Sequence, residues 1–429
     1  MSAANLLVEL FVEELPPKVL KKLGDSFATV LADSLKSQGL ADAQSQVTAY
    51  ASPRRLAVHV TGVLSKAADQ AVQQKLMPVS VGLDASGQAT PALLKRLSAL
   101  GAGPEAVVSL KRAPDGKAEA LFFDSVKVGA DLADGLQKAL DETIAKLPIP
   151  KVMNYQLEQG PGADFQPGWT SVNFVRPAHG LVALHGDQIV TIGALGLVSG
   201  RQTQGHRFES TVNPVVLRHA DSYAEQLASE GAVIASFEER RAEIVRQLKV
   251  AAAKAGEQLQ PIDDDALLDE VTALVERPNV LTGRFEETFL EVPQECLILT
   301  MKANQKYFPL LDTSAGKEGK LTHQFLIVSN ISPDDASAVI GGNERVVRPR
   351  LADAKFFYDQ DRKKTLESRV AGLSKVVYHG KLGTQGERVE RVRAIARAIG
   401  QQLGGDALAQ AADTAARLAK TDLVTDMVG

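Results

Sequence analysis

The stretch LLVELFVEELPPKVLKKLGDSFATVLADSLKSQG, residues 6–39, decides how the chain begins to fold. Its first seven residues form a largely apolar run, which a pair of prolines then breaks. Apolar residues follow at three- and four-residue spacing, which is typical of a helix that buries one face. Pro17 stands where a first-turn proline is tolerated, and Gly39 stands where a helix commonly ends. The stretch therefore predicts a strand, a turn and a helix.

The rest of the chain alternates between strand-like and helix-like segments, so the predicted fold class is a multidomain α+β protein. Gly186-Asp187 between two apolar runs predicts a hairpin. Residues 297–301 and 306–311 also read as strands. Four parts are expected: an N-terminal α+β domain from residues 1–65 and 148–215, an inserted or accessory lobe of residues 66–147, an α+β domain of residues 216–333, and an incomplete helical domain of residues 334–429.

Composition limits the classes of protein to consider. The 429 residues carry a formal net charge of -4, which excludes a globally basic nucleic-acid coat but leaves room for a local basic face. The single cysteine excludes an internal disulfide and fits a reducing compartment. The N-terminus lacks the basic region of a signal peptide, and no run of 18 apolar residues occurs. A cytoplasmic location without a membrane span is therefore expected.

Motifs that would bring catalytic chemistry are missing from the sequence. It contains no phosphate-binding loop, no dinucleotide fingerprint, no H-E-x-x-H and no G-x-S-x-G. None of the seven histidines has another histidine three or four residues away, so helix-borne metal ligands are not expected. We accordingly predict no catalytic residue and no metal site in this chain.

Charges are segregated along the sequence. Residues 263–295 hold ten acids against two bases, and residues 345–364 hold seven bases against three acids. The basic stretch can pair with the acidic one inside the fold, or it can contact a polyanion. Pro349 indicates an exposed helix start near the arginines, whereas Phe356 and its two neighbours are expected to lie mostly in the core.

Three other sets of cations are candidate contacts for phosphates, although each set also fits a structural role. Lys302 and Lys306 are expected at a turn between two strands. Arg54 and Arg55 open a strand, and a further set lies in a glycine-rich loop. With the basic stretch, the candidates are Arg54, Arg55, Arg201, His206, Arg207, Lys302, Lys306, Arg345, Arg348 and Arg350.

Several short motifs occur in order along nearly the whole chain. They are VEL at 8–10, EELPP at 13–17, SPRRLAV at 52–58, GHRF at 205–208, LDEVT at 268–272, MK at 301–302, QKYF at 305–308, GNERVVRPRLADA at 342–354, LGT at 382–384 and KTDLVTDMV at 420–428. Together they resemble the β subunit of the bacterial heterotetrameric glycyl-tRNA synthetase. The chain departs from the family at Arg277, where an aromatic residue is usual. Family members also continue into an HD-like helical region and an anticodon-binding domain, so we expect this chain to be C-terminally truncated.

The resemblance implies a role for the chain. In this family the α subunit carries the class II catalytic core and binds ATP, Mg²⁺ and glycine, while the β subunit holds tRNA-Gly in an α2β2 assembly. The N-terminal domains would resemble the tRNA-side domains of the phenylalanyl-tRNA synthetase β subunit, and the last domain would be HD-like. The expected function is to position tRNA for glycylation by the α subunit, with the ten cations as candidate tRNA contacts. Two alternatives stay open: a hydrolase of the editing or HD phosphohydrolase type, and a scaffold that binds no RNA.

Overall fold

The structure is a computed structural model that describes residues 2–84, 86–115 and 118–428. It has mixed α and β architecture, as predicted, and divides into two compact units. Unit 1 comprises Met1–Arg240 and Thr272–Arg277, and unit 2 comprises Arg241–Val271 and Pro278–Gly429. The two units are described separately below.

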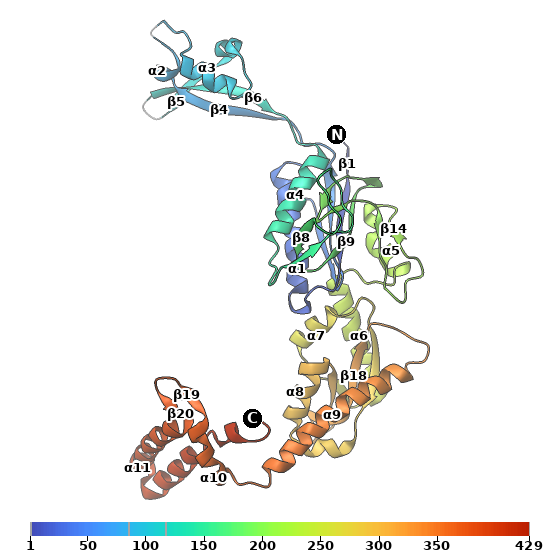
Figure 1. The fold of residues 1–429 in the computed structure, drawn as a ribbon, viewed down its shortest axis with the longest axis vertical. Coiled ribbons are helices and arrows are strands. Elements are labelled where there is room, and N and C mark those ends of the chain that lie inside the picture. The colour runs from blue at the N-terminus through green and yellow to red at the C-terminus, as the bar shows by residue number, and fades with distance from the viewer. Residues whose placement is uncertain (1, 85, 116–117, 429) are drawn as a thin grey trace. The chain divides into compact units, whose positions relative to one another are not determined.

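Unit 1 is built on a five-stranded antiparallel sheet with the strand order β10-β9-β1-β3-β2. Helices α1 and α4 cover one face of this sheet, and a segment containing β14 and α5 covers the other (Figure 1). The elements are β1 (Ala3–Val12), α1 (Leu20–Ser37), β2 (Val47–Ser52), β3 (Arg55–Leu64), α4 (Leu132–Lys146), β9 (Ala178–His185), β10 (Gln188–Ile189), β14 (Val215–Val216) and α5 (Tyr223–Ser229).

Strand β1 is covered on both faces, which explains its nearly continuous apolar sequence. Leu6, Val8 and Leu10 pack in the cluster that contains the α1 and α4 side chains. Leu7 points to the opposite face, into a cluster with Tyr223 of α5. The predicted strand, turn and helix of residues 6–39 are confirmed, with a short 3-10 turn (Pro17–Val19) before α1.

The inserted lobe is smaller than predicted. Its three-stranded sheet has the order β4-β6-β5, and its core centres on Leu93, Leu97 and Leu121. Helix α4 falls inside the predicted lobe of residues 66–147, but Leu136 and Leu140 bury it against α1 in the main core of unit 1. The lobe elements are β4 (Gln70–Pro78), α2 (Val79–Gly82), α3 (Pro91–Ser98), η2 (Pro104–Ser109), β5 (Lys111–Asp115) and β6 (Ala118–Lys127).

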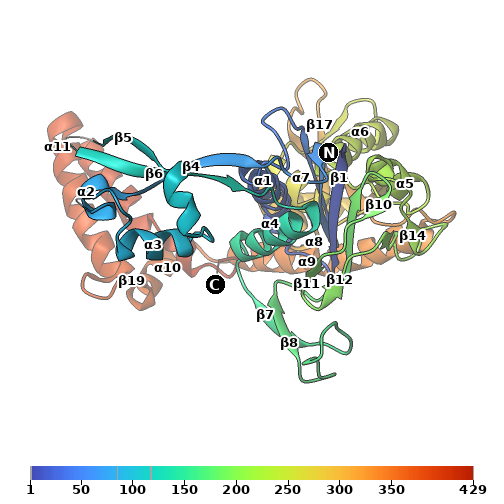
Figure 2. The ribbon, with the colours of Figure 1, turned by 90° about the horizontal axis from the view of Figure 1, so that it is seen from above.

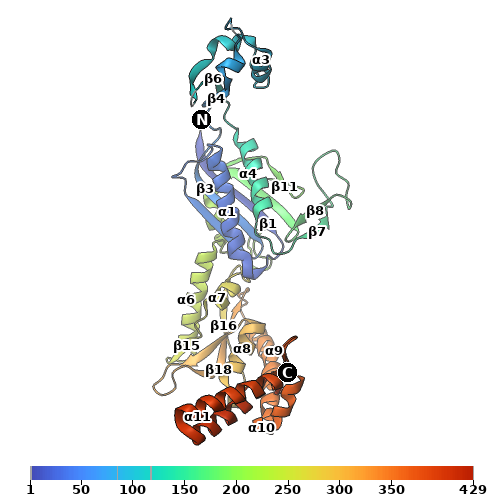
Figure 3. The ribbon, with the colours of Figure 1, turned by 90° about the vertical axis from the view of Figure 1, so that its left-hand side faces the viewer.

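Smaller pairs of strands complete unit 1. The hairpin predicted at Gly186-Asp187 is confirmed, and Gly186 adopts a left-handed φ of 64°. Strands β7 and β8 form a separate hairpin that projects from the sheet, as Figures 2 and 3 show. The remaining elements are β7 (Met153–Gln156), β8 (Ser171–Phe174), β11 (Gly193–Ala194), β12 (Leu197–Val198), β13 (Gln202–Thr203) and η3 (Ala220–Ser222).

Unit 2 contains a four-stranded antiparallel sheet with the order β15-β17-β18-β16. Helices α8 and α9 pack on it through a cluster that includes Met301, Val347 and Phe325. The elements are α6 (Phe237–Ala255) and α7 (Asp265–Thr272), whose ends belong in part to unit 1, then β15 (Leu259–Pro261), β16 (Asn279–Arg284), η4 (Glu287–Glu291), α8 (Gln294–Gln305), β17 (Phe308–Asp312), β18 (Lys320–Ser329) and α9 (Ser337–Asp361).

Two predictions fail in this unit. Residues 297–301 lie in helix α8 and not in a strand, because Leu297 and Met301 are four residues apart and bury one helical face. Pro349 does not start a helix but lies inside α9. The proline removes one helical N–H, and it is tolerated where that side of the helix is exposed. Residues 337–361 therefore pack with the preceding α+β domain, to which Val347 and Leu351 contribute core side chains.

The last part of unit 2 is mainly helical, as predicted. A glycine pair is a common place for a helix to end, and Gly404 and Gly405 have non-helical backbone angles that divide α11 into two parts. An HD-like identity for this part stays a prediction. No helix in the described part of the chain is long and apolar enough to cross a membrane. The elements are α10 (Leu366–Arg369), η5 (Val370–Lys375), β19 (Val377–His379), β20 (Gly383–Thr384), α11 (Gln385–Leu418) and η6 (Thr421–Val424).

Candidate functional site

Arg54 and Arg55 lie inside unit 1 and not on its surface. Their exposed fractions are 8% and 0%. Register pairs Arg55 of β3 with Phe11 of β1, and both guanidinium groups lie 5.3 Å from the centre of the Phe11 ring. Strand pairing therefore places Arg55 beside Phe11, and Arg54, in the turn directly before β3, brings its guanidinium group to the same ring.

Two buried carboxylates neutralise these arginines. Glu276 accepts hydrogen bonds from Arg54 Nε and Nη2 at 3.2 and 2.7 Å and from Arg55 Nη2 at 3.4 Å. Glu9 lies 3.6 Å from Arg55 Nη1 and also accepts a hydrogen bond from the Tyr223 hydroxyl. We call Glu9, Arg54, Arg55, Tyr223 and Glu276 the buried ionic network. Its arginines have their partners inside the protein, so the predicted contact with tRNA phosphates does not fit their positions.

The pKa shifts in the buried ionic network show which charges are kept. Burial alone lowers the pKa of Arg55, but the carboxylates of Glu9 and Glu276 outweigh it and the net pKa is raised. Burial raises the pKa of Glu276, but Arg55 and Arg54 outweigh it and the net pKa is lowered. Each partner therefore keeps the other ionised, which is the condition for a buried ion pair to persist.

The glycine-rich loop also uses its cations within the protein. His206 is 1% exposed, and its Nδ1 accepts hydrogen bonds from the amides of Phe208 and Glu209 at 3.2 Å each. Arg201 donates to the carbonyl oxygens of Asp187 at 2.6 Å and Leu217 at 3.4 Å. Both side chains fix the course of the loop, and His206 is closed to a macromolecular partner.

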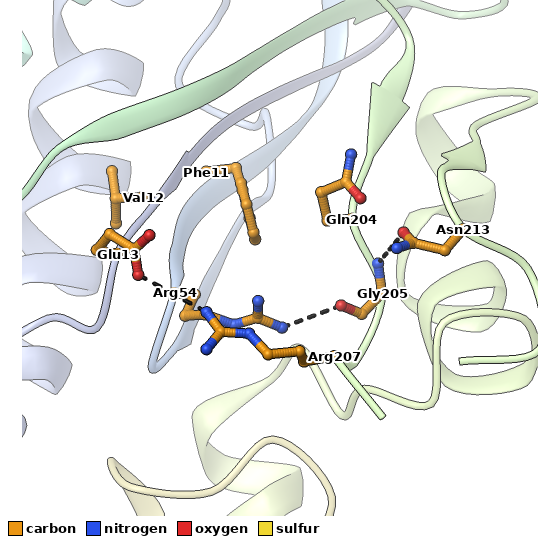
Figure 4. A pocket seen from close by; sticks show the side chains of 8 residues that line it. All are labelled: Phe11, Val12, Glu13, Arg54, Gln204, Gly205, Arg207 and Asn213. Carbon is orange, nitrogen blue, oxygen red and sulfur yellow. Dashed lines mark hydrogen bonds and ion pairs between the residues drawn. The ribbon is translucent and has the colours of Figure 1, made fainter. Parts of the chain in front are cut away.

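A small polar pocket of about 200 Å³ lies beside the buried ionic network (Figure 4). Arg54 donates to the carbonyl oxygen of Gly205 at 3.0 Å on one side of it. The exposed Arg207 lies 3.8 Å from Glu13 and 3.9 Å from Glu14. Both cations at the pocket thus have acidic partners nearby, and the pocket offers no uncompensated positive charge. It is lined by Phe11, Val12, Glu13, Arg54, Gln204, Gly205, Arg207 and Asn213.

Lys302 and Lys306 in unit 2 pair with the acidic stretch. Lys302 lies on α8 and forms an ion pair with Asp264. Lys306 ends α8 with a left-handed φ of 59° and lies 3.1 Å from Glu270. Neither residue stands at the tip of a hairpin, so the predicted setting for RNA contact is wrong.

The basic stretch of α9 divides according to helix face. Arg348 pairs with Glu286 at 2.5 Å, and Lys355 pairs with Glu291 at 2.6 Å. For Arg348 and Lys355, the basic stretch therefore pairs with the acidic stretch inside the fold, which is the first of its two predicted roles. Arg345 and Arg350 are exposed, and within residues 2–84, 86–115 and 118–428 neither takes part in an ion pair.

Residues outside the candidate set extend this exposed cationic surface. Arg362, Lys363 and Lys364 follow α9, are exposed, and form no ion pair in the part of the chain that the structure covers. Phe356 and Phe357 are 58% and 40% exposed, so the expectation that they lie in the core is wrong. If the helical period is continued through Pro349, Phe356 and Phe357 fall on a different face of the helix from the buried Val347 and Leu351.

Histidine, cysteine and acidic side chains are the usual protein ligands of metal ions. No cluster of three or more such residues that could hold a metal ion occurs in the described residues. At the pocket of Figure 4, the charged groups are compensated from within the protein.

Comparison with known proteins agrees with the motifs. The family model described as glycyl-tRNA synthetase beta subunit matches residues 6–429. A glycine–tRNA ligase beta subunit of Paracidovorax citrulli is 73% identical over this whole chain, and that of Leptothrix cholodnii is 72% identical. The chain spans about 60% of the length of each of these relatives. The chain belongs to the glycyl-tRNA synthetase β subunit family.

Proposed function

We propose that this chain holds tRNA-Gly for glycine–tRNA ligase, through exposed cations on α9 and directly after it. In this proposal a partner α subunit binds ATP, Mg²⁺ and glycine and carries out the chemical step in an α2β2 assembly in the cytoplasm. The chain itself contributes no catalytic group and no cofactor. Its contribution is to position the tRNA, which accelerates a reaction by converting a bimolecular encounter into an oriented one.

One observation carries the proposal: exposed cations without an ion pair gather on α9 and on the residues directly after it. Most other candidates are buried or paired, whereas Arg345 and Arg350 are neither. Arg362, Lys363 and Lys364 add three more exposed charges close in sequence. A polyanion binds such a surface by neutralising phosphates and releasing their counterions, even when the net charge of the protein is negative.

Salt dependence of tRNA binding tests the proposal. The double reversal Arg345→Glu with Arg350→Glu should weaken binding of tRNA-Gly and lower the slope of log K against log salt. Each lost phosphate contact removes roughly 0.7–0.9 from that slope, so a decrease of about 1.5 is expected. Fluorescence anisotropy with labelled tRNA at several salt concentrations gives both quantities.

A matched control keeps the same change in charge. Lys95→Glu with Arg96→Glu reverses two exposed cations on α3, which lies in the inserted lobe. We expect this control variant to keep most of the slope of log K against log salt that the unchanged protein shows. An unchanged slope for the α9 variant, with circular dichroism showing an intact fold, would reject α9 as the phosphate-binding segment.

A further inference from the structure

Phe356 and Phe357 form an exposed aromatic pair in the middle of the cationic segment. Their ring centres are 5.4 Å apart at an angle of 73°. Neither ring belongs to the hydrophobic cluster that Val347, Leu351 and Tyr358 of the same helix join. Two adjacent phenylalanine rings that stay exposed to water do not stabilise the folded chain. Exposed apolar patches often mark binding surfaces.

Helical geometry places one cation in the row of each ring. Residues four and seven positions apart lie on one face of a helix. Arg345 therefore lies in the row of Phe356, and Arg350 lies in the row of Phe357. Lys363 and Lys364 follow the last residue of α9 and lie close in sequence to both rings. Arg350 and Phe357 are about 10 Å apart along the axis at 1.5 Å per residue.

The charges around the aromatic pair are not compensated. Of the acids near the rings, Asp359 pairs with Lys355 and Asp361 pairs with Arg369. Among the described residues of α9, this leaves Asp353 against Arg345 and Arg350. The cations on the sides of α9 that approach the core, Arg348 and Lys355, pair with Glu286 and Glu291. Among the described cations of α9, those without an ion pair are therefore the two in the rows of the exposed rings, Arg345 and Arg350.

We infer that Phe356 and Phe357 stack with unpaired nucleotides of a bound tRNA while the flanking cations neutralise the neighbouring phosphates. This inference rests on the proposed function. Sequence-tolerant binding of single-stranded RNA combines a positive surface with aromatic rings on which bases stack. Paired bases hide their faces inside the duplex, so the occupant is a single-stranded part of the tRNA.

The double variant Phe356→Ala with Phe357→Ala tests the inference. Loss of a stacked base should weaken tRNA binding roughly 5- to 150-fold per base. The salt slope should stay unchanged, because no cation is removed. The Arg345 and Arg350 reversal should weaken binding and also lower the salt slope, so the two tests report on separate interactions.

Two further variants identify the interaction. Phe356→Leu with Phe357→Leu keeps much of the apolar surface but lacks an aromatic face, so it should also bind weakly. Trp169→Ala removes another aromatic side chain, 83% exposed in unit 1, and should bind like the unchanged protein. Binding assays with tRNA trimmed at its 3′ end locate the stacked bases: a smaller effect of the alanine variant would place them there, and an equal effect would place them in a loop.

Several outcomes would overturn the inference. Normal tRNA binding by the alanine or the leucine variant would exclude stacking. Loss of co-elution with an α subunit, together with normal tRNA binding, would instead identify the rings as a protein interface. If the unchanged chain shows no salt-dependent tRNA binding, the proposed function itself fails and the inference fails with it.

Discussion

Replacing Glu276 by glutamine should destabilise unit 1 much more than loss of a surface ion pair. Glu276 is 2% exposed and holds two guanidinium groups, with only Glu9 left to compensate them in the variant. Removing one partner of a buried ion pair costs about 3–5 kcal/mol. We expect a value near 3 kcal/mol, because the amide oxygen of glutamine can still accept one hydrogen bond. That is a large part of the roughly 5–15 kcal/mol that stabilises a typical domain.

Hydrogen–deuterium exchange of β1 and β3 measures this local effect in a chain of two units, for which a single melting temperature is poorly defined. A loss of 3 kcal/mol should accelerate exchange of the most protected amides by roughly a hundredfold. The control is Glu238→Gln, which removes an exposed pair with Lys21 and should cost under about 1 kcal/mol. Equal protection in the two variants would refute the assignment of a stabilising role to the buried ionic network.

Two more predictions follow from single residues. Although burial raises the pKa of Glu276, Arg55 and Arg54 lower it below the usual value. Its contribution is present above the unfolded pKa of about 4.3 and is lost as pH falls through the lower folded pKa, so Glu276→Gln should flatten acid unfolding below pH 5. Gly400→Ala should destabilise α11 by about 1–3 kcal/mol, measured by hydrogen–deuterium exchange of the amides of α11, because its Cβ would lie 2.8 Å from Ala409 Cα. Gly342→Ala in α9 meets nothing within 4 Å and should be neutral or stabilising, and a loss there equal to that of Gly400→Ala would contradict the packing argument.

The elements that could be predicted from the sequence are those whose spacing alone decides their type. The strand and helix of residues 6–39 and the break at Gly404-Gly405 belong to this class. The boundaries of the inserted lobe could not be predicted, because α4 has the spacing of any amphipathic helix and only packing shows which core it joins. Residues 297–301 were assigned to a strand because a short apolar run fits a buried helix equally well.

The candidate site was predictable in composition but not in geometry. Counting charges located the basic stretch and the acidic stretch, and the structure pairs part of one with the other. A count of charges does not show which cations face outward. A helix that starts at Pro349 leaves the residues before it without a helical face, whereas Pro349 in fact lies inside α9. With the helical phase of α9, Arg345 falls opposite Val347 and Leu351, whereas Arg348 and Arg350 fall on the two flanks of the buried face, and contacts are needed to show that Arg348 is the paired one.

Burial determines whether a cation of a family motif can meet RNA. The motif at residues 52–58 supports the family resemblance, yet its arginines are enclosed with Glu276 and Glu9 and specify the fold. An ion pair at the surface, unlike a buried one, does not prevent its cation from binding a polyanion. Arg348 and Glu286 are 52% and 44% exposed, and an exposed pair is worth about 0–1 kcal/mol, so a phosphate can replace the carboxylate at little cost. Exchange of the partner of Arg54 would instead break a buried ion pair and leave Glu276 with Arg55 alone, which costs several kcal/mol. The surface of α9 can therefore include Arg348 among the groups that bind a polyanion, whereas the buried ionic network cannot supply one.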